Sequence, residues 1–316
     1  MRVLSGTYLM PLEDGNQLAM YAVVSHSNVA SVNHGLSSDT VNSTSLGKGN
    51  IYGARWVIPM PVKQGMFHSV TLGVDYKDFA SDTNSTIITS TTSINTGPSH
   101  TPISYIPLSV GYNLSLPEVT DMTTANVTLN FKLRGVGDHS VGSDCDVQPP
   151  TQFQCNRNGA KPDYFYVRGG IDRTQSFLWG TSLYAKLDGQ MAGGPLISNE
   201  QFVAGGADSV RGYLEAEQVG DDGVHGTLEL RGPQWASGQV NDLRVLAFYD
   251  AAHLRVVNPV DYHDLASDGV GLRIQAWTEL NVRLDVGWPI KTTWIGNNII
   301  TSAGKVHVAF KATLAC

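Results

Sequence analysis

The feature that most constrains the fold of this chain is a two-residue alternation of apolar and polar side chains. It recurs in long segments along the whole sequence, and no long segment has a helical period. In one example, Val70, Leu72 and Val74 alternate with Thr71 and Gly73. Successive side chains of a β-strand point to opposite faces of its sheet, so each segment predicts a strand with one apolar and one polar face. The alternation therefore predicts an all-β protein.

The connections between the candidate strands predict how the sheet closes. We count thirteen candidate strands, at residues 2–11, 16–30, 49–60, 66–79, 103–115, 122–135, 163–176, 179–193, 223–232, 241–253, 268–277, 279–289 and 304–315. Short and long connections alternate strictly, and the long ones cover 31–48, 80–102, 136–162, 194–222, 254–267 and 290–303. All short turns then lie at one end and all long loops at the other. This is the up-and-down arrangement of an antiparallel transmembrane β-barrel.

Alternation alone does not separate a membrane barrel from a soluble β-sandwich, because both have one apolar face. Strand length favours the barrel, since a tilted strand needs ~9–11 residues to cross a bilayer and globular strands average ~5–6. Aromatic residues also gather near strand ends, where an interfacial girdle would lie: Tyr164, Phe165, Trp179, Trp277 and Trp288. We therefore expect residues 1–316 to form a single transmembrane barrel domain.

The composition excludes other classes of protein. The chain has 21 Lys and Arg residues against 28 Asp and Glu residues, and its net charge of −7 argues against a nucleic-acid-binding surface. No run of 18 apolar residues exists, so no transmembrane helix is predicted. The first residues lack the apolar segment of a signal peptide. The chain is therefore expected either to stay inside the cell or to lack its native N-terminus.

The connection 194–222 is unlike the other long connections. It contains a glycine pair followed by a Val-Arg-Gly-Tyr motif: Gly205, Gly206, Val210, Arg211, Gly212 and Tyr213. This stretch resembles the barrel of the two-partner-secretion transporters (TpsB), the haemolysin secretion and activation proteins of Gram-negative bacteria. Its flanks at 199–202, 220–223 and 228–231 match as well. The segment 247–252, with Phe248 and Asp250, is similar to the family's Phe-x-Asp-Ala-Gly motif, with alanine in place of the glycine.

The resemblance implies an outer-membrane barrel of sixteen strands, eleven before the matching loop and five after it, in which this loop folds back into the barrel. Five candidate strands follow the loop here and eight precede it. We therefore expect this chain to lack the first three strands, the periplasmic POTRA domains and the export signal, and to have open edges near Thr7 and Val308. We also expect it to lack the family's terminal aromatic residue, because the sequence ends at Cys316 and its nearest aromatic residue is Phe310.

The alternation also places Asp250 on the polar face of its strand. It shares that face with Phe248, opposite Val245 and Tyr249. If the apolar face contacts lipid, Asp250 faces the lumen. A guanidinium and a carboxylate form a bidentate, charge-assisted pair. We expect the loop to carry Arg211 into the lumen to bind Asp250; without the family, a solvated Arg in an external loop is the alternative.

Other chemical signals are weak. Cys145 and Cys155 flank a polar segment that contains prolines, a spacing that suits a small disulfide in an oxidising compartment; two free thiols are the alternative. Asp261, His263 and Asp264 have no second cluster of ligands beside them, so we expect a polar external loop and no metal site. The sequence has neither a nucleophile elbow nor a phosphate-binding loop, and we expect no enzyme and no cofactor.

Together these patterns predict an outer-membrane translocation pore that secretes a partner exoprotein of the haemolysin or adhesin type. The client would pass as an unfolded polypeptide. The expected partners are this client and outer-membrane lipid, with no nucleic acid. The alternatives are a barrel of the same superfamily that assembles other membrane proteins, a passive porin and a barrel hydrolase. The Arg-Gly-Tyr loop argues against the porin, and the missing nucleophile motif argues against the hydrolase.

Overall fold

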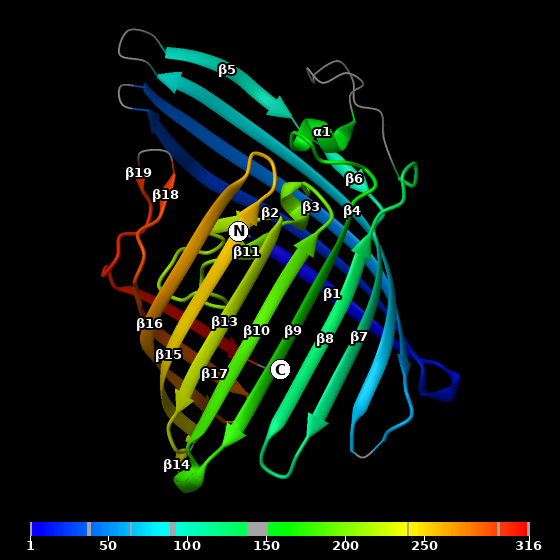
Figure 1. Ribbon diagram of the computed structural model, residues 1–316, viewed down its shortest axis with the longest axis vertical. Helices are drawn as coiled ribbons and strands as arrows, with labels where there is room; N and C mark the ends of the chain where they lie inside the picture. The colour runs from blue at the N-terminus through cyan, green and yellow to red at the C-terminus, as the bar shows by residue number, and fades with distance from the viewer. Residues whose placement is uncertain are drawn as a thin grey trace.

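Thirteen strands of the computed structural model follow one another in chain order, each paired antiparallel with the next, and together they form a strongly curved sheet (Figure 1). The described residues are 2–36, 39–63, 65–88, 93–100, 102–137, 151–238, 240–277, 279–295 and 298–314. The strands are β1 (Arg2–Pro11), β2 (Gln17–Leu36), β3 (Asp39–Pro59), β4 (Phe67–Ile88), β7 (Leu108–Pro117), β8 (Met122–Phe131), β9 (Phe165–Ser176), β10 (Ser182–Ala192), β13 (Asp222–Arg231), β15 (Val240–Val256), β16 (Asp261–Ala276), β17 (Leu280–Pro289) and β20 (His307–Leu314). The predicted all-β, up-and-down fold is confirmed.

Shorter elements complete the sheet and its loops. Strands β5 (Ser93–His100) and β6 (Ile103–Tyr105) pair with β4, and β14 (Trp235–Ser237) pairs with β15. Two separate pairs form in loops, β11 (Phe202–Ala204) with β12 (Gln218–Gly220) and β18 (Trp294–Ile295) with β19 (Asn298–Ile299). Across the described ranges the helical elements are α1 (Gln152–Asn156) and the 3₁₀ turns η1 (Glu13–Gly15), η2 (Leu178–Gly180) and η3 (Ser198–Glu200). None of the helices in this part of the chain is long and apolar enough to span a membrane.

Several hairpins are longer than the alternation predicted. β2 and β3 stay paired as far as Leu36 and Asp39, so the predicted connection 31–48 is mostly strand. β4 enters 80–102 in the same way, and β15 and β16 cover most of 254–267. The segment 31–48 is rich in Ser, Thr and Asn, which removes the apolar alternation from the sequence. An antiparallel ladder needs only backbone donors and acceptors, so the strands continue beyond their apolar part.

The two faces of the sheet are of opposite polarity, and the apolar face points outward. On β15 the side chain of Tyr249 is 46% exposed, whereas that of Asp250 is fully buried. The same alternation places Leu228 outside and Glu229 inside on β13. A soluble sandwich would bury its apolar face. The outward apolar face is therefore that of a membrane barrel.

The predicted aromatic girdle is present in part. Trp179 and Trp277 are exposed at short turns, and Phe165 is exposed at the other end of β9. The prediction is wrong for Tyr164, which is buried against Tyr105. The physical reason is that neighbouring residues in extended chain point to opposite sides, so Tyr164 and Phe165 cannot both face lipid.

Apolar side chains also pack inside the barrel. One buried cluster is built from β6, α1, β9 and the start of the 194–222 loop: Ile103, Tyr105, Phe153, Ala160, Tyr164, Tyr166, Leu196 and Ile197. A second joins the same loop to β15 and β16: Phe202, Ala204, Val210, Tyr213, Ala252, Leu254 and Leu265. In addition, β12 contacts β15 and β16. The loop is therefore packed against the inner wall.

Candidate functional site: an internal loop and its charge clamp

Arg211 lies inside the barrel and binds Asp250 of β15 through both carboxylate oxygens. Its Nε donates to Oδ2 at 2.7 Å and its Nη2 to Oδ1 at 2.8 Å. The backbone N–H of Arg211 donates to the same Oδ2 at 3.1 Å. The Arg211 side chain is 2% exposed and that of Asp250 is 0% exposed. This is the bidentate geometry in which a guanidinium binds a carboxylate most strongly.

Two further side chains complete this clamp around Arg211. Nη1 of Arg211 donates to Glu229 Oε1 at 2.6 Å. The guanidinium carbon lies 3.5 Å from the ring centroid of Phe248, which is a close cation–π contact. The register of β13 and β15 pairs Glu229 with Phe248 and Thr227 with Asp250. Because strand side chains alternate, these wall residues face the lumen together. We call Arg211, Asp250, Glu229 and Phe248 the clamp.

The charges around the clamp form a continuous network along the barrel wall. Asp285 of β17 accepts from Arg273 at 2.8 Å and from Arg283 at 2.6 Å. Arg283 also reaches back to Asp208 of the loop at 2.9 Å. On the other side, Arg231 binds Glu229 at 2.7 Å. Each buried carboxylate therefore has a cationic partner, as buried charges require.

Glycines set how closely the loop approaches the wall. Gly212 has a φ of +92°, and its backbone lies directly against Gly287 of β17. A Cβ atom on Gly287 would lie 2.8 Å from the Gly212 nitrogen and 3.0 Å from its Cα. Gly205 and Gly206, with φ of +106° and +105°, are in the left-handed region that favours glycine. A side chain on Gly205 would place a Cβ 2.6 Å from the Leu214 carbonyl oxygen.

The residues beside Arg211 anchor the tip of the loop. Val210 is fully buried in the second apolar cluster. The hydroxyl of Tyr213 donates to the carbonyl of Ala266 or of Lys291, each at 2.9 Å. It also accepts from the Lys291 backbone N–H at 3.2 Å. Tyr213 thus joins the loop to the first half of β16 and to the connection after β17.

The beginning of the loop is fixed to a different part of the wall by Glu200. Its Oε1 accepts from Lys77 Nζ and from the Tyr105 hydroxyl, both at 2.6 Å. Its Oε2 accepts from the Tyr166 hydroxyl at 2.7 Å. These partners come from β4, β6 and β9, whereas the clamp is on β13 and β15. The loop is therefore tied to two separate regions of the barrel.

A third tie closes the end of the loop. Asp221 is fully buried and binds Arg157, whose Nη2 donates to Oδ2 at 2.8 Å. The backbone N–H groups of Leu196 and Val257 each donate to this carboxylate at 2.8 Å. Burial alone would raise the pKa of Asp221, but the hydrogen bonds from Arg157, Leu196 and Val257 outweigh it and lower the pKa. Asp221 therefore joins the segment after α1, the loop and the end of β15 as a carboxylate.

The sequence pointed to Arg211, Asp250, Phe248, Val210, Gly212 and Tyr213, and the structure brings all six together. The sequence patterns did not assign roles to Glu229, Glu200 or Gly287. Glu229 could have been found from the strand phase, because it shares the polar face of β13 with Arg231. Glu200 and Gly287 could not have been found in this way, because their partners lie far away in sequence.

The cysteine pair is only partly covered by the described residues. Cys155 lies in α1 and is disulfide-bonded. Cys145 lies outside the described residues, so the predicted pairing stays a prediction. Within the described ranges, no group of three His, Cys, Asp or Glu residues is arranged to hold a metal ion. In the predicted polar loop, Asp264 instead pairs with His253 at 2.6 Å and with Lys291 at 2.9 Å.

The chain is similar in sequence to known proteins. The family model described as haemolysin secretion/activation protein ShlB/FhaC/HecB matches residues 117–274, half of the chain. The outer membrane transporter CdiB of Dickeya dadantii is 27% identical over 207 residues, which are 64% of this chain and 35% of that protein. The chain thus spans about a third of the length of this curated relative.

Two solved structures share the fold. CdiB from Escherichia coli has a TM-score of 0.65 at 14% identity, covering 99% of this chain and 59% of that one. BamA from Haemophilus ducreyi lacking POTRA domains 1–3 has a TM-score of 0.60 at 16% identity, covering 98% of this chain and 62% of that one. At these identities the similarity is one of fold.

Proposed function

We propose, from the premise that this chain belongs to the haemolysin secretion/activation protein family of the bacterial outer membrane, that it secretes a partner exoprotein through its barrel. The client would be an unfolded polypeptide of the haemolysin or adhesin type. Residues 1–316 would act as one barrel domain, with the loop 194–222 as an internal plug. The observation that carries this proposal is the buried clamp between Arg211 of the loop and Asp250 of the wall.

The clamp suits a plug that is stable at rest and can still be displaced. A buried ion pair is specific in geometry, but its Coulomb attraction is largely offset by the cost of desolvating both groups. Entry of water and of a polar client would rehydrate Arg211 and Asp250 as they separate. The surrounding wall also carries alternate charges, which suit the passage of a hydrated, extended polypeptide. No covalent chemistry is needed for these steps.

The test is a secretion assay with the native gene product. The cells express an exoprotein of the haemolysin or adhesin type, with or without the transporter, and the amount of exoprotein in the medium is measured. We expect export to depend on the transporter. The amounts of other outer-membrane proteins are measured in the same cells. If cells without the transporter export the exoprotein unchanged but lose the other outer-membrane proteins, the proposal is overturned in favour of the assembly barrel, which shares this fold.

A further inference from the structure

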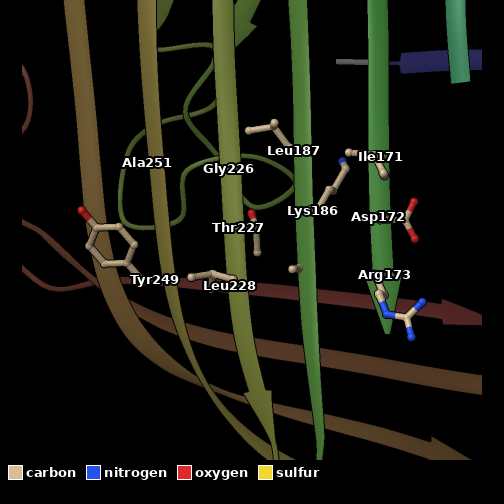
Figure 2. Close-up of a pocket in the computed structure, with 11 residues that line it drawn as sticks. Ile171, Asp172, Arg173, Lys186, Leu187, Gly226, Thr227, Leu228, Tyr249 and Ala251 are labelled. Atoms are coloured by element: carbon tan, nitrogen blue, oxygen red, sulfur yellow. The ribbon is translucent and has the colours of Figure 1, made fainter. Parts of the chain in front are cut away.

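A hollow lies on the outward face of the barrel, on the opposite side of the wall from the plug. Its volume is about 430 Å³, within the ~300–1,000 Å³ typical of small-molecule sites. It spans β9, β10, β13 and β15 (Figure 2). Its lining side chains that point outward are almost all apolar, and none of them takes part in the clamp.

The hollow arises from small residues set among large ones. The register places Gly226 between Leu187 of β10 and Ala251 of β15. In the adjacent row, Leu228 stands between Ala185 and Tyr249. The small side chains therefore form the floor, and Leu187, Leu228 and Tyr249 form the walls. This shape fits a slender apolar chain.

The end of the hollow nearest the short turns is charged. Arg173 lines it, close to the end of β9 (Figure 2). Its guanidinium is 3.3 Å from Glu118 and 3.5 Å from Asp121, both in the turn between β7 and β8. The side chains of Arg173 and Glu118 are 40% and 53% exposed. The guanidinium also donates to Thr123 and to Gln175, each at 2.7 Å. A partly exposed cation flanked by two carboxylates therefore lies beside the apolar hollow.

We propose that this groove holds one acyl chain of a zwitterionic phospholipid with a primary ammonium headgroup. The phosphate would meet Arg173, and the ammonium would donate to Glu118. The two carboxylates disfavour a headgroup with net negative charge, and a quaternary choline ammonium has no N–H to donate to them. The inference rests on the outer-membrane location and on short turns that face the periplasm, where phospholipid forms the inner leaflet. It does not depend on secretion.

The test measures lipid retained by the purified full-length protein in native mass spectrometry. Ethanolamine, glycerol and choline phospholipids with identical acyl chains are offered to it in equal amounts. We expect one retained ethanolamine lipid per protein. Ala251→Leu fills the groove and should lose it. Ala247→Leu is the matched control, because Ala247 is exposed on the same face of the same strand outside the groove, and it should retain the lipid. Heat-modifiable migration checks that both variants are folded.

The headgroup is tested by Glu118→Gln, which leaves the groove unchanged. We expect it to remove the preference for ethanolamine over choline lipid while an acyl chain still binds. Equal retention of the three lipids by the native protein would overturn the headgroup assignment. Retention by Ala251→Leu would overturn the groove assignment. A dimer that is lost in Ala251→Leu, without any retained lipid, would show a second copy of the chain to be the occupant.

Discussion

At Arg211 three carboxylate oxygens accept hydrogen bonds from one guanidinium, and a fourth, Oδ1 of Asp285, lies 3.7 Å from Nη1. The partners that remain after a substitution determine its effect. Without the Arg211 side chain, Glu229 still has Arg231, but among the described residues Asp250 keeps only the backbone N–H of residue 211. Without the Asp250 carboxylate, Arg211 still has Glu229. Removing one partner of a buried ion pair costs ~3–5 kcal/mol. Because Arg211 keeps a carboxylate partner when Asp250 is replaced, whereas Asp250 keeps no cationic side chain from the described part of the chain when Arg211 is replaced, the two substitutions are not equivalent.

We expect Arg211→Ala to lower both secretion and the temperature at which the barrel loses its compact migration in gels. Asp250→Ala should have the same direction of effect and a smaller size, because Glu229 still neutralises Arg211. The double variant should be no worse than Arg211→Ala alone, since the two side chains act as one unit. Thermal migration and exported protein are measured for all three. A larger effect of Asp250→Ala than of Arg211→Ala would contradict this account of the clamp.

Gly287 gives a second prediction for single residues. A methyl group there would lie 2.8 Å from the Gly212 nitrogen, so Gly287→Ala should push the loop away from β17. Gly226→Ala is the matched control, because its Cβ would meet nothing closer than 3.7 Å. We expect faster cleavage of the 194–222 loop by added protease in Gly287→Ala, with Gly226→Ala like the native protein. Equal cleavage rates in the two variants would show that this contact does not hold the loop.

At the scale of elements, the loop depends on Glu200 as well as on the clamp. Glu200→Ala would leave Lys77, whose side chain is 17% exposed, without its carboxylate inside the barrel. We expect this variant to lower the unfolding temperature. Adding Lys77→Met should restore part of the loss, because it removes the unpaired buried charge. The measurement is thermal unfolding of the single and double variants. A double variant less stable than Glu200→Ala would mean that Lys77 contributes by packing rather than by its charge.

Local features of the strands could be predicted from the sequence, whereas contacts between distant segments could not. Strand order, phase and the inward position of Asp250 followed from alternation, because that pattern is local. The extent of the β2–β3 hairpin did not follow from alternation, because its Ser- and Asn-rich part has no apolar face and therefore no alternating pattern. Glu200 meets Lys77 across 123 positions of sequence, and no periodicity reports such a contact. Arg211 was found only because its motif is shared with a known family.

At the scale of the whole molecule, the outward apolar face implies that solvent differs on the two sides of the wall. Asn126 and Val127 are neighbours on β8 and both are exposed. Asn126 shares the inward face with Thr124, which binds Asp172, whereas Val127 shares the outward face with Leu129. In a soluble protein, both positions would face water. In a barrel, Asn126 faces the lumen and Val127 faces acyl chains.

Arginine at these two positions tests the difference directly. Asn126→Arg should assemble as the native protein does, because a guanidinium in the lumen stays hydrated. Val127→Arg should lose ~2–4 kcal/mol of stability in the bilayer, the cost of arginine on the lipid face near the midplane. This loss is measured as the fraction of heat-modifiable protein in the outer membrane, or after refolding into vesicles whose bilayers differ in thickness. The deficit of Val127→Arg should grow with vesicle thickness, because a thicker bilayer keeps the guanidinium farther from its headgroups. Equal assembly of both variants would mean that the outward face does not contact lipid at this level of the wall.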